Sequence, residues 1–156
     1  MLTISMQKAM DDPYQAVGVL LVDVARLLRR NFNRRAQALG LTQPQWQALA
    51  RLSQNQGMNQ ACLADLLEVQ PITLTRLIDR LEAAGWVERR PDPADRRVQR
   101  LYLTIKAEPL LDDMRALAAE TREEAMQGLS DRQRKQLIQF LQTIKGNLVR
   151  AEVARA

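Results

Sequence analysis

Five arginines lie close together in residues 88–104, the stretch ERRPDPADRRVQRLYLT, where two prolines and two aspartates interrupt the chain. The guanidinium group of arginine is a planar fork of hydrogen-bond donors that fits phosphate groups and the edge of guanine. The whole chain has the same bias, because it contains nineteen arginines against four lysines and carries a net charge of +5. This composition favours nucleic acid as a binding partner, and a codon bias of the source genome is the alternative explanation for the arginine excess.

Residue types that common enzymes require are missing from the sequence. There is no histidine, the only cysteine is Cys62, and no glycine-rich phosphate-binding motif occurs. Histidine acid–base chemistry, thiolate zinc sites and the usual nucleotide-binding loops are therefore excluded. We expect no catalytic residues, no metal site and no cofactor. An enzyme that uses carboxylates alone stays a third interpretation. Cys62, a lone cysteine among apolar residues of a helix, is expected to be buried and inert.

The chain has the size and polarity of one domain that folds in the cytoplasm. It has 156 residues, of which 46% are hydrophobic, so it can bury a sizeable core. No apolar run approaches the length of a membrane span, and the N-terminus lacks a signal-peptide pattern. A single cysteine is typical of a reducing compartment. We therefore expect cytoplasmic localisation and no membrane partner.

The elements that must position the arginines can be predicted from helical spacing, caps and turn residues. Asp12 and Pro13 are typical of a helix start, and an apolar stripe then continues until Gly40. The same reasoning predicts helices over 42–56, 61–67, 71–84, 110–125 and 130–148, and strands over 86–90 and 98–104. In the short helix we expect the apolar residues to pack inward, namely Ala61, Leu63, Ala64, Leu66 and Leu67.

The helix predicted to begin at Pro71 has two different faces. Its apolar residues recur at i, i+3, i+4 and i+7, at Leu74, Leu77, Ile78 and Leu81. The opposite face is mostly polar, and it carries Ile72, Arg76, Asp79, Arg80 and Ala83, with Thr73 and Thr75 on its flanks. Two short helices with such an outer face predict a helix-turn-helix, and the hairpin that follows predicts a wing.

The predicted fold class is mainly α (α+β), a winged helix-turn-helix with long N- and C-terminal dimerisation helices. We expect a single domain over 1–156, with a DNA-binding lobe at 42–104 and a helical dimerisation region at 12–39 and 105–150. The long helices expose apolar stripes that a small winged helix could not cover. A second copy of the chain is their natural partner.

The string DRRVQRLYLT, preceded by LIDRLEAAGWVERR, resembles the signature of the MarR family of bacterial transcriptional regulators. The matching positions are Asp95, Arg97, Leu101, Leu103 and Thr104. The strings LTQPQW, LTIKAEPLLDDM and TREEAMQGLS, with alanine at Ala107, are similar to the SlyA branch of that family. The resemblance implies the winged-helix fold and a dimer that binds DNA.

In a winged helix the recognition helix enters the major groove and the wing reaches the flanking minor groove. Arg97 matches the arginine of the family's wing, and Asp95 matches the acid that orients it. We expect Arg96 to touch phosphate. The alternative is a solvated turn in which the Asp95–Arg97 pair only stiffens the hairpin. Arg89, nearer the strand base, could as easily be structural.

On the recognition helix, the residues expected to face the groove are Ile72, Thr73, Thr75, Arg76 and Arg80. Arginine can bind guanine, and the carbons of threonine and isoleucine can contact a thymine methyl group. Asp79 would lie beside phosphate, so we expect it to pair with Arg76 or Arg80.

The resemblance also implies a small-molecule site between the dimerisation helices and the DNA-binding lobe, often for aromatic acids. Arg26 and Arg29 lie three residues apart on the first helix, and Trp46 begins the second. Two guanidinium groups near an indole could bind a carboxylate with a stacked ring. Alternatively, the arginines reach solvent or pair with Asp23, and Trp46 belongs to the core.

The leading hypothesis is a homodimeric, sequence-specific DNA-binding regulator that reads a pseudo-palindromic operator, possible effectors being small aromatic carboxylates. The alternative is a winged-helix module that grips an acidic protein. The two hypotheses differ in what they require, because an acidic partner needs only net charge, whereas an arginine at the wing tip needs a groove.

Overall fold

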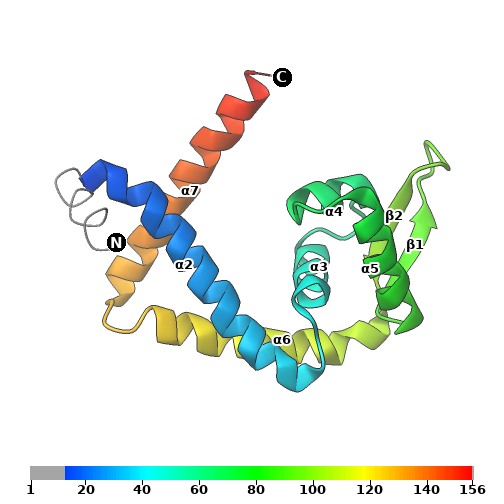
Figure 1. The fold of residues 1–156 in the computed structure, drawn as a ribbon, viewed down its shortest axis with the longest axis horizontal. Coiled ribbons are helices and arrows are strands. Elements are labelled where there is room, and N and C mark those ends of the chain that lie inside the picture. The colour runs from blue at the N-terminus through cyan, green and yellow to red at the C-terminus, as the bar shows by residue number, and fades with distance from the viewer. Residues whose placement is uncertain (1–12, 156) are drawn as a thin grey trace, which may run out of the picture. The chain divides into compact units, whose positions relative to one another are not determined.

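The computed structural model describes residues 13–155. Along the chain its elements are α2 (Pro13–Ala36), a 3-10 turn η1 (Gln37–Leu39), α3 (Gln43–Gln54), α4 (Gln60–Leu66), α5 (Pro71–Ala83), β1 (Val87–Pro91), β2 (Gln99–Leu103), a 3-10 turn η2 (Ile105–Ala107), α6 (Glu108–Ala125) and α7 (Asp131–Val153) (Figure 1). The chain divides into two compact units between Thr121 and Arg122, near the end of α6. The mainly α fold with a small antiparallel sheet is therefore confirmed. Within residues 13–155, no helix has an apolar stretch long enough to cross a lipid bilayer.

Local signals in the sequence place the helix boundaries of the first unit. Thr42 is the N-cap residue of α3, and its own backbone N–H donates back to Oε1 of Gln45 in the first turn at 2.9 Å. Asn59 caps α4 by accepting the N–H of Cys62 at 2.7 Å. Pro71 occupies the first turn of α5, where its missing N–H costs nothing. The starts of α3 and α5 confirm the predicted ones, whereas the Asn59 cap of α4 had not been predicted.

The two strands form an antiparallel hairpin in which Val87 pairs with Leu103 and Pro91 with Gln99. A third segment joins this hairpin at β2. Gly57 donates its N–H to the Leu101 carbonyl at 2.8 Å, and Leu101 donates to the Met58 carbonyl at 2.9 Å. Gly57 has φ of 80°, and a Cβ there would lie 2.9 Å from the Tyr102 hydroxyl oxygen. Glycine therefore suits both the backbone conformation and the close approach of Tyr102.

The core of the first unit joins the helix pair to the hairpin. Its largest fully buried side chains come from α3, α4, α5 and both strands, and they are Leu49, Leu52, Leu63, Leu74, Ile78, Leu81, Val87 and Leu101. The predicted apolar face of α5 is thus confirmed in full. Because the hairpin contributes to this core, the wing and the recognition helix are held in one packed body.

The prediction for α4 was partly wrong. Leu63 and Ala64 are buried and Leu67 is half-buried, whereas Ala61 and Leu66 are exposed. Cys62 is also exposed, contrary to the expectation that it would be buried. A helix of seven residues that packs on one side can bury only a narrow stripe, and an apolar sequence overstates the width of that stripe.

The long helices carry exposed apolar side chains. On α2 these include Val19, Leu20 and Val22. None of the residues 131–153 of α7 is buried, and its exposed apolar side chains include Phe140, Leu148 and Val153. In the second unit Ser130 caps α7, as predicted, and Arg134 pairs with Glu123 at 2.9 Å.

Candidate nucleic-acid interface

The turn between the strands presents Arg97 to solvent in a fixed orientation. Asp95 Oδ1 accepts hydrogen bonds from the backbone N–H and from Nε of Arg97, both at 3.0 Å. Asp95 Oδ2 accepts a third from Nη2, also at 3.0 Å. The Arg97 side chain is nevertheless 90% exposed. These hydrogen bonds, the side-chain one foremost, lower the pKa of Asp95. The carboxylate therefore stays ionised and aims a guanidinium group that keeps most of its surface free.

A second aspartate anchors the base of the same turn. Asp92 is buried, and its carboxylate accepts the N–H of Ala94 at 2.7 Å and Nε of Arg100 at 2.5 Å. Arg100 also donates from Nη1 to the Gly57 carbonyl at 2.9 Å. The bond from Ala94 and then the bond from Arg100 lower the pKa of Asp92 despite its burial. Asp92 and Arg100 thus join the turn to the segment before α4.

Sequence reasoning did not identify the roles of Asp92 and Arg100. In the sequence, Asp92 followed by a proline predicts only a turn. Its partner lies eight residues away, across the hairpin, and nothing in the local spacing points to that pairing. A predicted register for the two strands would have brought the two residues close enough to suggest it.

The outer face of α5 is exposed over most of its length. Ile72, Thr73, Arg76 and Arg80 are all exposed. Within residues 13–155, the arginines that form ion pairs do not include Arg76 or Arg80, so both of these guanidinium groups are available for a ligand. Arg96, beside Arg97 in the turn, is exposed in the same way. The structure therefore brings the expected arginines of the helix and of the turn to the surface of one compact unit.

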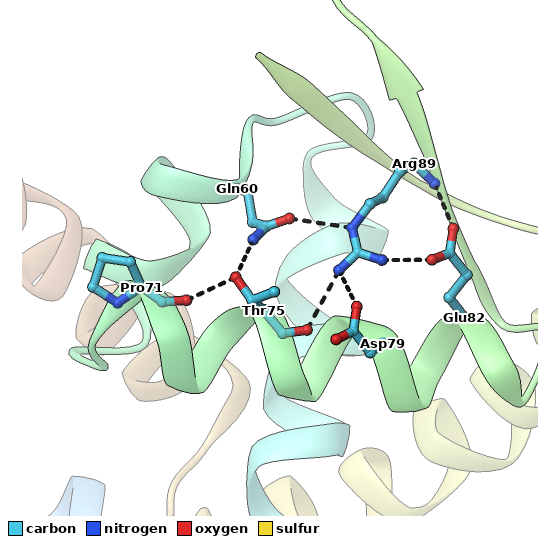
Figure 2. A network of polar contacts seen from close by, with 6 residues as sticks. All are labelled: Gln60, Pro71, Thr75, Asp79, Glu82 and Arg89. Carbon is cyan, nitrogen blue, oxygen red and sulfur yellow. Dashed lines mark hydrogen bonds and ion pairs between the residues drawn. The ribbon is translucent and has the colours of Figure 1, made fainter. Parts of the chain in front are cut away.

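Thr75 differs from its neighbours on the predicted face. It is half-buried, and its hydroxyl donates to the Pro71 carbonyl at 3.0 Å and accepts Nε2 of Gln60 at 2.8 Å (Figure 2). The hydroxyl is thus occupied inside the protein, which leaves Thr75 poorly suited to direct contact with a base.

The prediction for the ion-pair partner of Asp79 was wrong. Asp79 pairs with Arg89 of β1 at 2.6 Å, and not with Arg76 or Arg80 of its own helix. Figure 2 shows the Arg89 guanidinium reaching across from the strand to α5, where it also meets Glu82. Of the two roles considered for Arg89, the structure favours the structural one.

The three residues expected to bind an effector are only partly brought together. Trp46 packs edge-on against Phe32 of α2, with ring centroids 4.6 Å apart, and its Nε1 donates to Asn33 Oδ1 at 3.3 Å. Arg29 lies one helical turn before these two α2 residues and is exposed. Arg26 is also exposed and pairs with Asp23 at 2.9 Å, as the alternative interpretation anticipated.

A helix pair whose second helix has a free polar face, followed directly by a hairpin that shares its core, defines a winged helix-turn-helix protein. Residues 41–98 match the model of the MarR family. The solved transcriptional regulator PA3341 is 35% identical over 85% of this chain and 98% of its own, with a TM-score of 0.75. This chain belongs to the MarR family.

Other members are similar to a comparable degree. A MarR transcriptional regulator from Methanosarcina mazei Go1 is 29% identical over 88% of this chain and 99% of its own, with a TM-score of 0.78. The transcriptional regulator SlyA is also 29% identical, over 88% of this chain and 94% of its own, with a TM-score of 0.68. Because SlyA is no more similar than the others, the comparisons do not single out the SlyA branch expected from the sequence.

Proposed function

We propose that this MarR-family regulator is a homodimer that reads a pseudo-palindromic DNA operator. Residues 42–104 form the DNA-binding lobe in this proposal, with α5 in the major groove and the wing in the flanking minor groove. Arg97 carries the proposal, because a guanidinium group that is 90% exposed yet held by Asp95 suits insertion into a narrow groove. Arg76, Arg80 and Arg96 would contact bases or phosphates beside it.

The dimer is supported by the apolar surfaces of the long helices. Phe140 of α7 is 64% exposed, and exposed apolar side chains recur along α2. Surfaces of this kind are unusual on a monomer, whereas a second copy would cover them. In the proposal, residues 12–39 and 105–150 supply the dimer interface. A two-fold dimer would place its half-sites about one helical turn of DNA apart.

A small aromatic carboxylate is the proposed effector. Arg29 and Trp46 are the better-placed part of the expected site, since Arg29 precedes the residues of α2 that contact Trp46. Arg26 would have to leave Asp23 to join them. A regulator of this kind acts where the DNA is, so we place it in the cytoplasm.

Selection from a random-sequence DNA pool tests this function directly. The protein is incubated with long random duplexes, bound duplexes are recovered and amplified over several rounds, and the products are sequenced. We expect a pseudo-palindrome with A·T-rich outer positions. Recovery of no common sequence would refute sequence-specific DNA binding.

A competition measurement with the selected duplex distinguishes DNA from an acidic protein as the partner. Polyglutamate offers anionic charge without grooves, so an excess of it should leave binding to the selected duplex largely intact. Complete competition by polyglutamate would instead favour the protein-interaction module.

A further inference from the structure

Arg89 of β1 is the most extensively bonded side chain at the junction of wing and recognition helix. Its side chain is only 19% exposed, although it is the neighbour of the exposed Arg90. In the hairpin it pairs in register with Leu101, whose side chain is fully buried. The guanidinium group therefore leaves the strand next to the core and spans the gap to α5 (Figure 2).

The contacts of Arg89 extend over two turns of α5 and include α4. Nη1 donates to Glu82 Oε2 at 2.5 Å, and Nη2 donates to Asp79 Oδ1 at 2.6 Å and to the Thr75 carbonyl at 3.3 Å. Nε donates to Gln60 Oε1 of α4 at 3.3 Å. The backbone N–H of Arg89 donates to Glu82 as well, at 3.3 Å. A planar fork with donors in fixed directions can satisfy these acceptors only at one orientation of strand and helix.

The charges of this network matter for a ligand as negative as DNA. Asp79 and Glu82 are 57% and 42% exposed, and they lie on the helix that the proposed function places in the major groove. Two unpaired carboxylates there would repel phosphate. Arg89 supplies the positive charge that pairs with both, and leaves Arg76 and Arg80 free of them.

The position of Arg89 along the hairpin links the network to the wing tip. Arg97 lies at the far end of the hairpin whose first strand contains Arg89. If α5 sits in one groove, the angle between α5 and the hairpin decides whether Arg97 reaches the next groove. A small change in this angle would displace Arg97 by a distance that increases with the length of the hairpin.

We propose that Arg89 is a positioning residue for operator recognition: it fixes the wing against α5 and offsets part of the negative charge of the two carboxylates of α5, so that helix and wing engage their grooves together. The proposal rests on the proposed function. It assigns Arg89 no contact with DNA. Its specific consequence is that loss of Arg89 lowers discrimination between the operator and random DNA, and not affinity alone.

Arg90 provides a matched control for a charge change at Arg89. It is the next residue of the same strand, its side chain is 59% exposed, and its guanidinium lies 4.4 Å from the centre of the Tyr102 ring. Successive side chains of a strand point to opposite faces, so Arg90 points away from the Arg89 network. Arg89→Gln and Arg90→Gln remove the same charge from adjacent positions.

The experiment measures binding of each variant to two probes, the duplex that the parent protein selects and the unselected random pool. The ratio of the two affinities is the readout. Arg89→Gln should lower this ratio by about tenfold or more, the effect expected when one specific contact is lost. Arg90→Gln should weaken binding to both probes by similar factors and leave the ratio unchanged. Arg89→Lys keeps the charge without the fork, so it should restore binding to the random pool but not the ratio.

Thermal unfolding shows whether each variant is folded, so that a loss of structure is not mistaken for a loss of discrimination. Should Arg89→Gln not fold, Arg89→Lys and Asp79→Asn still test the proposal, because each disturbs the network while leaving most of it in place; both should lower the ratio. An unchanged ratio in the folded Arg89 variants overturns the positioning role. A parent protein with no preference for any duplex overturns the proposed function itself, and the role of Arg89 with it.

Discussion

Replacing Arg97 by alanine tests the wing most directly. The substitution removes a guanidinium group that is 90% exposed and whose ion pair is with Asp95 of the same turn. Asp95 keeps its bond from the backbone N–H of residue 97, so the turn retains part of its support. Exposed pairs of this type contribute little to stability. We therefore expect the thermal midpoint of the variant to remain close to that of the parent.

The effect on DNA binding should be much larger than the effect on stability. A good arginine contact strengthens binding by about fivefold at the low end of the usual range. The proposed dimer would insert two such side chains, one on each side of the operator. Arg97→Ala should thus weaken operator binding by about 30-fold or more, and it should reduce discrimination at the outer A·T positions.

Arg96→Ala is the matched control, because it removes the same charge from the adjacent exposed residue. As a phosphate contact, Arg96 should support binding to operator and random DNA equally. Its loss should also flatten the dependence of log affinity on log salt concentration by roughly one unit per lost contact. The assay is a salt titration of both variants on the selected duplex and on the unselected pool. If Arg97→Ala binds the selected duplex as tightly as the parent, the wing is only a stiffened turn.

Three further predictions concern the dimer, the effector and pH. Phe140→Glu should place charge in the dimer interface, so sedimentation at micromolar concentration should show a monomer where the parent is a dimer; a folded parent monomer would contradict the dimer. Salicylate-like acids should weaken operator binding by the parent but not by an Arg29→Ala, Trp46→Ala variant, and equal binding of the acid to both proteins would place the pocket elsewhere. Folding lowers the pKa values of Asp92 and Asp95 below the ordinary 3.8, so their contribution to stability is complete above that pH and is lost as the pH falls through the lowered values. Asp92→Asn, at the buried carboxylate, should therefore be less stable than the parent in urea at neutral pH and equal to it in strong acid, whereas a difference that did not change with pH would argue against the carboxylate.

Much of the fold could be predicted because its signals are local. Thr42, Pro71 and Ser130 mark helix starts by chemistry that acts within one turn of the chain. The apolar spacing of α5 likewise predicts its buried face, since one helix alone determines which side chains share that face. The hairpin could be predicted from two short strand-like segments separated by a turn rich in proline and aspartate.

The ion pairs of the site could not be predicted in the same way. Asp79 was assigned to an arginine of its own helix because spacing rules consider only neighbours three or four residues away. Its actual partner, Arg89, lies ten residues further along and on a strand. Such a contact depends on how the strand packs against the helix, which is a property of the tertiary structure.

The anchors of the hairpin all lie outside its tip at residues 93–97, and this affects how proteins of this shape can diverge. Arg89 joins the first strand to α5, and Asp92 with Arg100 joins the turn to Gly57. Beyond these anchors, residues 93–97 add no buried side chain to the core. Substitutions at the tip therefore cost little folding stability, whereas substitutions at Arg89, Asp92 or Arg100 remove the contacts that hold the hairpin against the rest of the unit. Under the proposed function, the tip can change its sequence, and with it the preferred DNA, while the scaffold that carries it stays constant.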